Sequence, residues 1–240
     1  MPADGAAKEG RGRPTVRPSV KAFIQARMSS GRYPGKVLAP FRGEPLIRHV
    51  VQVIEQVLPP SDIVVATSSE VSDDPLAHYL ETLGITVHRG PLRNVFERYL
   101  MCLCDHPCDW ILRISGDSPL LFPELIRFIV RQADHFDGDL ITTIFPRTFP
   151  NGQNAELIRT RSLQVISSAE LTPNDQEHVT PYFYRHHDRM QIMNVESGDP
   201  RLAEVSLAVD TVEDLQRLER LSPEDLRRFT PPILAAGVVS

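Results

Sequence analysis

The sequence has little that would tie the chain to a membrane or to nucleic acid. No apolar run approaches the ~18–20 residues that a membrane-spanning helix needs, and the N-terminus has no apolar signal core. The formal net charge is -5, so the whole molecule has no general attraction for nucleic acid or an anionic membrane. We therefore expect neither as a partner, and any anion site must be a local concentration of Arg and Lys.

Cysteine is also scarce, with three residues in the 240-residue chain. Cys102, Cys104 and Cys108 lie close together with His106 among them. Their spacing is not a standard zinc spacing, and no second cluster completes four ligands. A metal site and small buried side chains both stay open as interpretations. The pattern favours reduced thiols and hence a cytoplasmic protein.

Two common nucleotide-binding motifs are missing as well. The sequence contains neither G-x-x-x-x-G-K-[ST] nor G-x-G-x-x-G. Their absence disfavours a P-loop NTPase and a dinucleotide-dependent enzyme. A nucleotide site in this chain must therefore be built in another way.

What the sequence does contain is an alternation of short apolar runs with segments of helical period. It predicts strands at 20–24, 62–67, 85–88, 110–114, 139–143 and 205–209, and helices at 45–58, 73–83, 93–104, 122–133 and 212–221. Such alternation is typical of an α/β fold with a mainly parallel sheet and helices on both faces.

The composition divides the chain into one domain with two tails. Residues 1–18 are rich in Gly, Pro, Ala and Arg and predict a disordered basic tail. We expect the domain over 19–230 and a C-terminal tail over 231–240. The alternation breaks down over 145–190, which predicts an insertion with helices near 161–171 and 175–185.

The loop after the first strand concentrates positive charge. It carries Arg27, Arg32 and Lys36. Ligands bind beyond the carboxyl ends of the strands in open α/β sheets, so this loop begins at a binding edge. Ser29, Ser30, Gly31 and Gly35 would let the backbone approach a ligand and offer N–H groups to it. These features suit a triphosphate, and the alternative is a solvated basic loop.

Two acids follow predicted strands and should meet at the same edge. Asp117 follows the strand at 110–114, and Asp210 follows the strand at 205–209. Paired carboxylates suit Mg²⁺, which prefers oxygen ligands and would neutralise charge on reacting phosphates. Taken singly, each acid has another interpretation. Asp117 could form a turn before Pro119, and Asp210 precedes a good helix start at Thr211.

The loop also carries a family resemblance. Residues 25–38 resemble the signature A-R-x-x-S-x-R-x-P-x-K of the cytidylyltransferases that act on KDO and sialic acid-like sugars, in particular the SpsF-like branch. Tyr33 departs from the usual Leu of that branch. The G-D-S-P segment at 116–119 and V-D-T-x-x-D-L at 209–215 match further family segments. The resemblance covers about residues 20–221, and it implies the Rossmann-like nucleotide-diphosphosugar transferase (GT-A type) fold.

The resemblance also implies roles for individual residues. Arg27, Arg32 and Lys36 would hold the CTP phosphates and, with Asp117, form the catalytic set, while Asp117 and Asp210 would bind magnesium. The residues expected to contact the nucleotide are Gln25, Ala26, Arg27, Ser29, Ser30, Gly31, Arg32, Lys36, Thr67, Arg89, Arg98 and Gly116.

Three further residues are expected at the acceptor. Glu156 ends a segment similar to the family's P-D-G-x-D-x-E, although Asn151 and Asn154 replace both aspartates. His178 lies in E-H-V-T-P-Y, another family segment. Arg113 lies within a predicted strand, where an unpaired charge is costly, so an acid or a phosphate must be near. By analogy with similar enzymes, the insertion implies a homodimer.

The reaction implied is transfer of CMP from CTP to an acidic sugar, with release of pyrophosphate. Three alternatives stay open: a cytidylyltransferase acting on a small phosphonate or another non-sugar anion, a GT-A glycosyltransferase, and a non-catalytic nucleotide-binding protein. The segment G-D-S-P in place of D-x-D, and a loop with three cations, disfavour the glycosyltransferase.

Overall fold

The computed structural model describes residues 17–235. Most of the predicted basic tail, up to residue 16, lies outside the described residues. Within the described part of the chain, no helix is long and apolar enough to cross a membrane.

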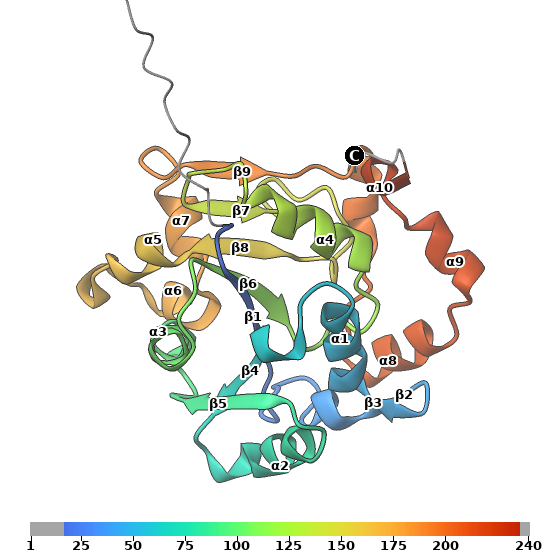
Figure 1. The fold of residues 1–240 in the computed structure, drawn as a ribbon. Helices are drawn as coiled ribbons and strands as arrows, with labels where there is room; N and C mark the ends of the chain where they lie inside the picture. Colours follow the sequence, from blue (N-terminus) through green and yellow to red (C-terminus); the bar gives the residue numbers. More distant parts are fainter. Residues whose placement is uncertain (1–16, 236–240) are drawn as a thin grey trace, which may run out of the picture.

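Seven strands of the described chain form one sheet in the order β5-β4-β1-β6-β8-β7-β9 (Figure 1). Their bounds are β1 Val20–Gln25, β4 Ile63–Ser68, β5 Thr86–Gly90, β6 Trp110–Ser115, β7 Leu140–Thr142, β8 Glu156–Arg159 and β9 Ile192–Asn194, while β2 Pro40–Phe41 and β3 Glu44–Pro45 form a small hairpin. Only β8 runs antiparallel to its neighbours in the large sheet. The predicted mainly parallel sheet is confirmed.

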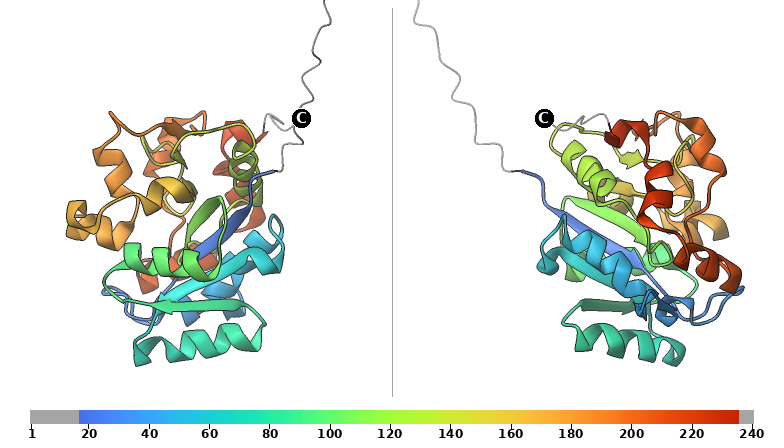
Figure 2. Two further views of the ribbon diagram at one scale, coloured as in Figure 1. Left: turned by 60° about the vertical axis from the view of Figure 1, so that its left-hand side comes forward. Right: turned by 90° about the vertical axis from the view of Figure 1, so that its right-hand side faces the viewer.

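Helices cover both faces of the sheet, as predicted (Figures 1 and 2). Side chains of α1 Leu46–Glu55, α2 Asp74–Thr82, α4 Pro123–Gln132 and α8 Val212–Glu219 pack into the core on one face. Those of α3 Val95–Asp105, α5 Thr160–Gln164 and α7 Pro181–Arg185 pack into the core on the other, with α6 Pro173–His178 against α3. Two short helices, α9 Pro223–Arg228 and α10 Pro232–Ala235, follow α8.

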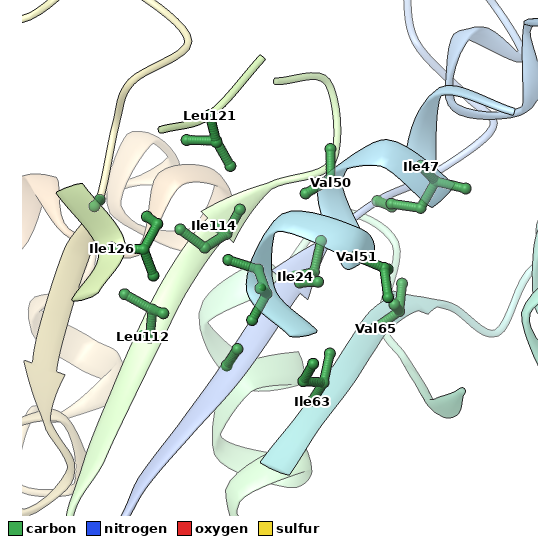
Figure 3. Close-up of a cluster of buried hydrophobic side chains, with 14 of the residues drawn as sticks. Ile24, Ile47, Val50, Val51, Ile63, Val65, Leu112, Ile114, Leu121 and Ile126 are labelled. Atoms are coloured by element: carbon green, nitrogen blue, oxygen red, sulfur yellow. The ribbon is translucent and has the colours of Figure 1, made fainter. Parts of the chain in front are cut away.

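Helix α1 shows why the core forms where it does. Leu46, Ile47, Val50, Val51 and Ile54 are fully buried and recur at the spacing of one helical face. They lie over the aliphatic side chains of β1, β4 and β6 (Figure 3). Burying a side chain of this size contributes about 1.5–3 kcal/mol. This packing fixes the positions of β1 and β6, whose carboxyl ends border the candidate site.

The prediction of a strand at 205–209 is wrong. This segment is extended, but its only strand-like pairing is an isolated bridge between Ser206 and Asn151. In that bridge the Leu207 N–H donates to the Asn151 carbonyl (2.7 Å), and beyond it the Val209 N–H donates to the Asp117 carbonyl in a loop (2.9 Å). The apolar residues correctly indicated that the segment is buried, but they could not indicate which groups its backbone bonds to.

The stretch at 145–190 also differs from the simple insertion that we expected. It supplies β8, which lies inside the main sheet between β6 and β7. The predicted helix at 161–171 ends early, because α5 stops at Gln164. The predicted helix at 175–185 is divided at Val179, which has a positive φ of 69°. Pro173 and Pro181 open α6 and α7, in accordance with the preference of proline for the first helical turn.

The expected C-terminal tail is partly structured. Residues 232–235 form α10, and the Ile233 N–H donates to the Ser197 carbonyl at 3.1 Å. This part of the chain is therefore attached to the domain.

Candidate active site

A cavity of about 340 Å³ lies at the carboxyl ends of β1 and β6. Its size falls within the range of small-molecule sites. Most predicted site residues line it: Gln25, Ala26, Arg27, Ser30, Gly31, Arg32, Lys36, Arg113, Gly116, Asp117, His178 and Asp210. One edge of the sheet thus brings together residues far apart in the sequence.

Two groups of residues lie in and beside this cavity. The phosphate side consists of Arg27, Arg32, Lys36, Asp117 and Asp210. The acceptor side consists of Arg113, Glu156, Tyr184, Thr142 and His178. The names follow the roles that the sequence predicts, except for Tyr184 and Thr142, which are included because the Tyr184 hydroxyl contacts both Glu156 and Thr142.

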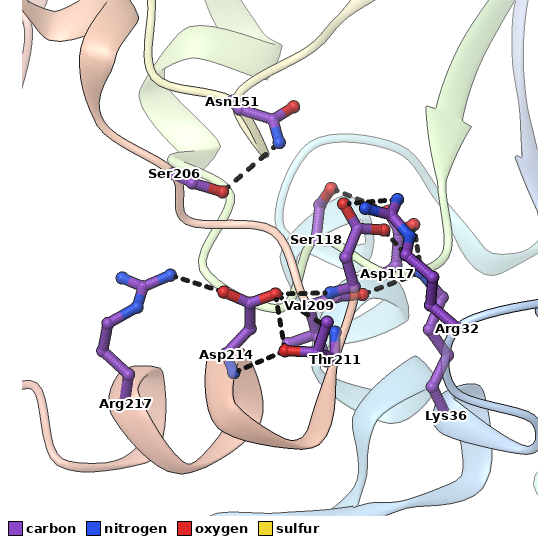
Figure 4. A network of polar contacts seen from close by, with 11 residues as sticks. Arg32, Lys36, Asp117, Ser118, Asn151, Ser206, Val209, Thr211, Asp214 and Arg217 are labelled. Atoms are coloured by element: carbon purple, nitrogen blue, oxygen red, sulfur yellow. Dashed lines mark hydrogen bonds and ion pairs between the residues drawn. The ribbon is translucent and has the colours of Figure 1, made fainter.

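Lys36 is the centre of the phosphate side (Figure 4). Its ammonium donates to Asp117 Oδ2 at 2.7 Å, to Asp210 Oδ1 at 3.2 Å and to the Val209 carbonyl at 2.7 Å. Arg32 pairs with the other oxygen of Asp210 at 3.0 Å. The backbone bond from Val209 to Asp117 holds the two acids together although no strand precedes Asp210.

The two acids fit a divalent cation. Their carboxylates lie within 3.2 Å of one ammonium, so one small cation can be shared between them. Carboxylate oxygens are hard ligands of the kind that Mg²⁺ takes, with water and phosphate oxygens completing the shell. No group of three or more His, Cys, Asp or Glu residues suited to a metal occurs between residues 17 and 235. Asp117 and Asp210 therefore suit an ion that arrives with phosphate ligands.

The cluster at Cys102, Cys104 and Cys108 shows no metal geometry in the described chain. All three cysteines are free; Cys102 lies on α3 and is buried in the core, Cys108 is half-buried, and Cys104 is exposed. Burial raises the pKa of Cys108 to about 12. The interpretation as small buried side chains holds for Cys102 but not for the exposed Cys104.

Arg27 connects the two sides of the site. It lies two residues beyond β1, and its guanidinium pairs with Glu177 of α6 at 2.9 Å. The hydrogen bond from Arg27 holds the pKa of Glu177 below its usual range. Sequence reasoning missed Glu177, although it directly precedes the predicted His178. The position of Glu177 beside His178, in the same family segment, could have identified it as a site residue.

The acceptor side is a row of polar side chains across neighbouring strands. Thr142, Glu156 and Arg113 stand in register on β7, β8 and β6. Glu156 is fully buried and accepts hydrogen bonds from Arg113 and from the Tyr184 hydroxyl, which also lies 2.8 Å from Thr142 Oγ1. Arg113 also donates to Gln25 at 3.3 Å, so the row reaches the cavity.

The charged groups of this row stabilise one another. Burial alone would lower the pKa of Arg113, but the adjacent Glu156 carboxylate raises it overall. Burial and the same carboxylate raise the pKa of Tyr184. The expected acid near Arg113 is thus Glu156, which lies behind the cavity rather than on its lining. His178 lines the cavity from the end of α6.

The two asparagines make different contacts. Asn151 donates to the Ser206 hydroxyl at 3.3 Å and so ties its loop to the segment before Asp210 (Figure 4). Asn154 accepts from Arg147, whose pKa is lowered by burial. An amide at position 154 leaves the charge of Arg147 without a carboxylate at that contact.

Five predicted site residues do not line the cavity: Ser29, Thr67, Arg89, Arg98 and Glu156. Arg89 donates to the Ser68 and Glu70 carbonyls and pairs with Asp74. Thr67 is fully buried and its hydroxyl has no partner among the described residues. Arg98 is also fully buried, not the surface charge that a helical Arg would suggest.

Gly116 reaches the cavity for a packing reason. A Cβ at this position would lie 2.8 Å from the Ala26 Cβ and 3.0 Å from the Gln25 carbonyl oxygen. The Gly116 N–H donates to that same oxygen at 2.8 Å. Glycine therefore lets the ends of β1 and β6 approach, which brings Asp117 next to the phosphate loop, the segment over 25–36 that carries Arg27, Arg32 and Lys36.

The chain is similar to known cytidylyltransferases. The sequence model of the cytidylyltransferase family matches residues 22–230. The chain is 32% identical over 206 residues to the spore coat polysaccharide biosynthesis protein SpsF of Bacillus subtilis, covering 83% of this chain and 84% of that protein.

Two further relatives extend the likeness. The chain is 29% identical over 154 residues to the 3-deoxy-manno-octulosonate cytidylyltransferase of Anaeromyxobacter sp. (strain K), covering 62% of this chain and 59% of that protein. A cytidylyltransferase structure from Leptospira borgpetersenii superposes with a TM-score of 0.80 at 25% identity, covering 92% of this chain and 93% of that one.

Proposed function

The chain belongs to the cytidylyltransferase family, and on that premise we propose that it transfers CMP from CTP to an acidic sugar with release of pyrophosphate and the help of Mg²⁺. One observation carries the assignment to this cavity. Arg27, Arg32 and Lys36 converge on a single cavity with the paired acids Asp117 and Asp210. A triphosphate with its metal needs that combination of charges.

The phosphate side would act by exchanging partners. Each of its three cations now contacts a carboxylate, and the phosphates of CTP would take the place of these acids. Asp117 and Asp210 would then hold Mg²⁺, which supplies charge neutralisation at the α-phosphate and the leaving pyrophosphate. Arg27 and Arg32 would each donate hydrogen bonds to two phosphate oxygens, while the ammonium of Lys36 would supply a point charge.

The acceptor side would place the nucleophile. Arg113 and His178 face the cavity, and Glu156 holds Arg113 from behind. An acceptor oxygen would attack the α-phosphorus in line with the bond to pyrophosphate, so the rate would come from placement and charge stabilisation. The positive charge of Arg113 suits an anionic acceptor.

The acidic-sugar acceptor is supported by the names of relatives. One acts on 3-deoxy-manno-octulosonate by name, and another is named for polysaccharide biosynthesis.

We further propose a cytoplasmic homodimer. The free cysteines support the compartment, and light scattering in solution would show a monomer if the assembly is wrong.

The acceptor is tested by release of pyrophosphate from Mg·CTP. Acidic sugars, including 3-deoxy-manno-octulosonate, form one arm of the screen, and small phosphonates form the other. Release with an acidic sugar supports the proposal. Release only with a phosphonate keeps cytidylyl transfer and replaces the acceptor, and no release with either arm counts against transfer to these acceptors.

A further inference from the structure

A buried acid lies behind the loop that carries Arg27. Asp73 is fully buried between β4 and α2 and makes no ion pair within the described residues. Its Oδ1 accepts from the Met28 N–H at 2.6 Å. Its Oδ2 accepts from the Ser68 N–H at 3.0 Å and from the Ser68 hydroxyl. A buried carboxylate is costly unless hydrogen bonds compensate it, so these contacts hold it firmly.

These bonds join two neighbouring parts of the binding edge. Met28 is the residue after Arg27, and Ser68 is the last residue of β4, the parallel neighbour of β1. The Met28 carbonyl in turn accepts from the N–H groups of Ser30 (3.0 Å) and Gly35 (2.7 Å). The backbone of one residue, Met28, therefore links Asp73 to both ends of the loop, from Arg27 to the residue before Lys36.

Asp73 occupies a position where an acid usually has another task. It is the N-cap residue of α2, and an aspartate there normally accepts from the free N–H groups of the first turn. Its side chain makes no such bond. Both carboxylate oxygens point instead to the phosphate loop and the end of β4. Stabilising the helix therefore does not explain the residue.

Arg98 supplies a counter-charge nearby. It is fully buried, and its three guanidinium nitrogens have no hydrogen-bond partner among the described residues. Burial lowers its pKa, with Arg27 lowering it further and Asp73 opposing the change. Gly90 makes room for its stem, since a Cβ there would lie 3.0 Å from the Arg98 Cγ. Arg98 therefore places a buried positive charge behind the loop.

We infer that Asp73 is a positioning residue for nucleotide binding, which holds the Met28 backbone so that Arg27 and Lys36 face the phosphates before CTP arrives. The inference rests on the proposed function of the loop. A loop with Ser29, Ser30, Gly31 and Gly35 would otherwise lose much conformational freedom on binding. Fixing it in advance lowers that cost.

The test compares Asp73→Asn with Asp74→Asn in the full chain. Asp74 is the adjacent acid, but it is exposed and pairs with Arg89. Calorimetry gives the Kd of Mg·CTP, hydrogen–deuterium exchange reports the amides of residues 25–36, and thermal melting reports global stability. We expect Asp73→Asn to weaken CTP binding about tenfold or more and to speed exchange in the loop, while Asp74→Asn stays within about twofold of wild type.

A purely structural role would lower Tm and leave the Kd and the loop exchange of the folded protein unchanged, which would overturn the inference. If Asp73→Asn does not fold, Ser68→Ala removes one donor and keeps the carboxylate. It should weaken CTP binding about threefold and speed loop exchange, and wild-type values for both would contradict the role. If wild type binds no CTP, the proposed function fails, and loop exchange alone still decides whether Asp73 holds the loop.

Discussion

The phosphate side and the acceptor side hold their charges in different ways. On the phosphate side the outer ion pairs are partly exposed, with the side chains of Arg32 and of Glu177, the partner of Arg27, 70% and 47% exposed, whereas Lys36 at the centre is 10% exposed. On the acceptor side the Glu156 side chain is 1% exposed and is bonded by both Arg113 and Tyr184. Exposed pairs can exchange a carboxylate for a phosphate at little cost, whereas a buried pair cannot be opened without leaving a desolvated charge. The outer pairs of Arg27 and Arg32 are therefore suited to change partners, and the acceptor side is suited to stay fixed.

The largest effect is expected from Lys36→Met on the phosphate side. This change removes the cation that contacts both Asp117 and Asp210, and we expect a loss of turnover of about 100-fold or more. Pyrophosphate release is the measurement. The control is Lys21→Met, which removes a lysine paired with Asp62 and should leave the rate unchanged. Full activity of Lys36→Met would show that the site is misassigned.

Glu156→Gln should have the largest effect on stability. It leaves the buried Arg113 without its carboxylate, and removing one partner of a buried ion pair costs about 3–5 kcal/mol. Urea unfolding gives the free energy. Glu177→Gln is the matched change at an exposed pair and should cost less than about 1 kcal/mol. Equal losses for the two variants would break the contrast between the sides.

Tyr184→Phe should have a smaller effect of the same kind. It removes the hydroxyl shared by Glu156 and Thr142, and we expect a loss of about 1–2 kcal/mol in the free energy of unfolding. Tyr182→Phe is the control, because its hydroxyl bonds to the half-exposed Glu170. A larger loss in the control would argue against a rigid acceptor side.

The smallest effect is expected from Glu177→Gln on CTP binding. The Glu177 carboxylate pairs with Arg27 and is not one of the two metal-binding candidates. Neutralising it frees Arg27 and removes a negative charge near the triphosphate, so CTP should bind about two- to fivefold more tightly. Calorimetry measures this, with Glu213→Gln on α8 as a control. Weaker binding would mean that Glu177 orients Arg27 rather than competing for it.

The sequence predicted the phosphate side well because that side depends on local order. The loop follows β1 directly, and strand ends in a parallel sheet meet at one edge, so Arg27, Lys36 and Asp117 could be brought together from pattern alone. Asp210 was expected there for a partly wrong reason. The strand at 205–209 does not form, and a backbone bond from Val209 to Asp117 holds the acid in place.

Contacts that depend on tertiary packing could not be predicted in this way. Nothing in the pattern around Asp73 separates it from an ordinary helix cap, because its role depends on how β4 stands beside the loop. Glu156 reaches Arg113 only because β8 lies in the sheet beside β6. We expected an insertion there, so this pairing could not be predicted. Glu177 pairs with Arg27 from 150 positions away, which periodicity cannot report.

The most direct test of the account is calorimetric binding of the four nucleoside triphosphates, with and without Mg²⁺. It needs no knowledge of the acceptor and addresses the phosphate side alone. The account predicts that CTP binds best and that Mg²⁺ strengthens its binding. Tighter binding of a UDP- or GDP-sugar than of CTP, or no binding of any triphosphate, would contradict it.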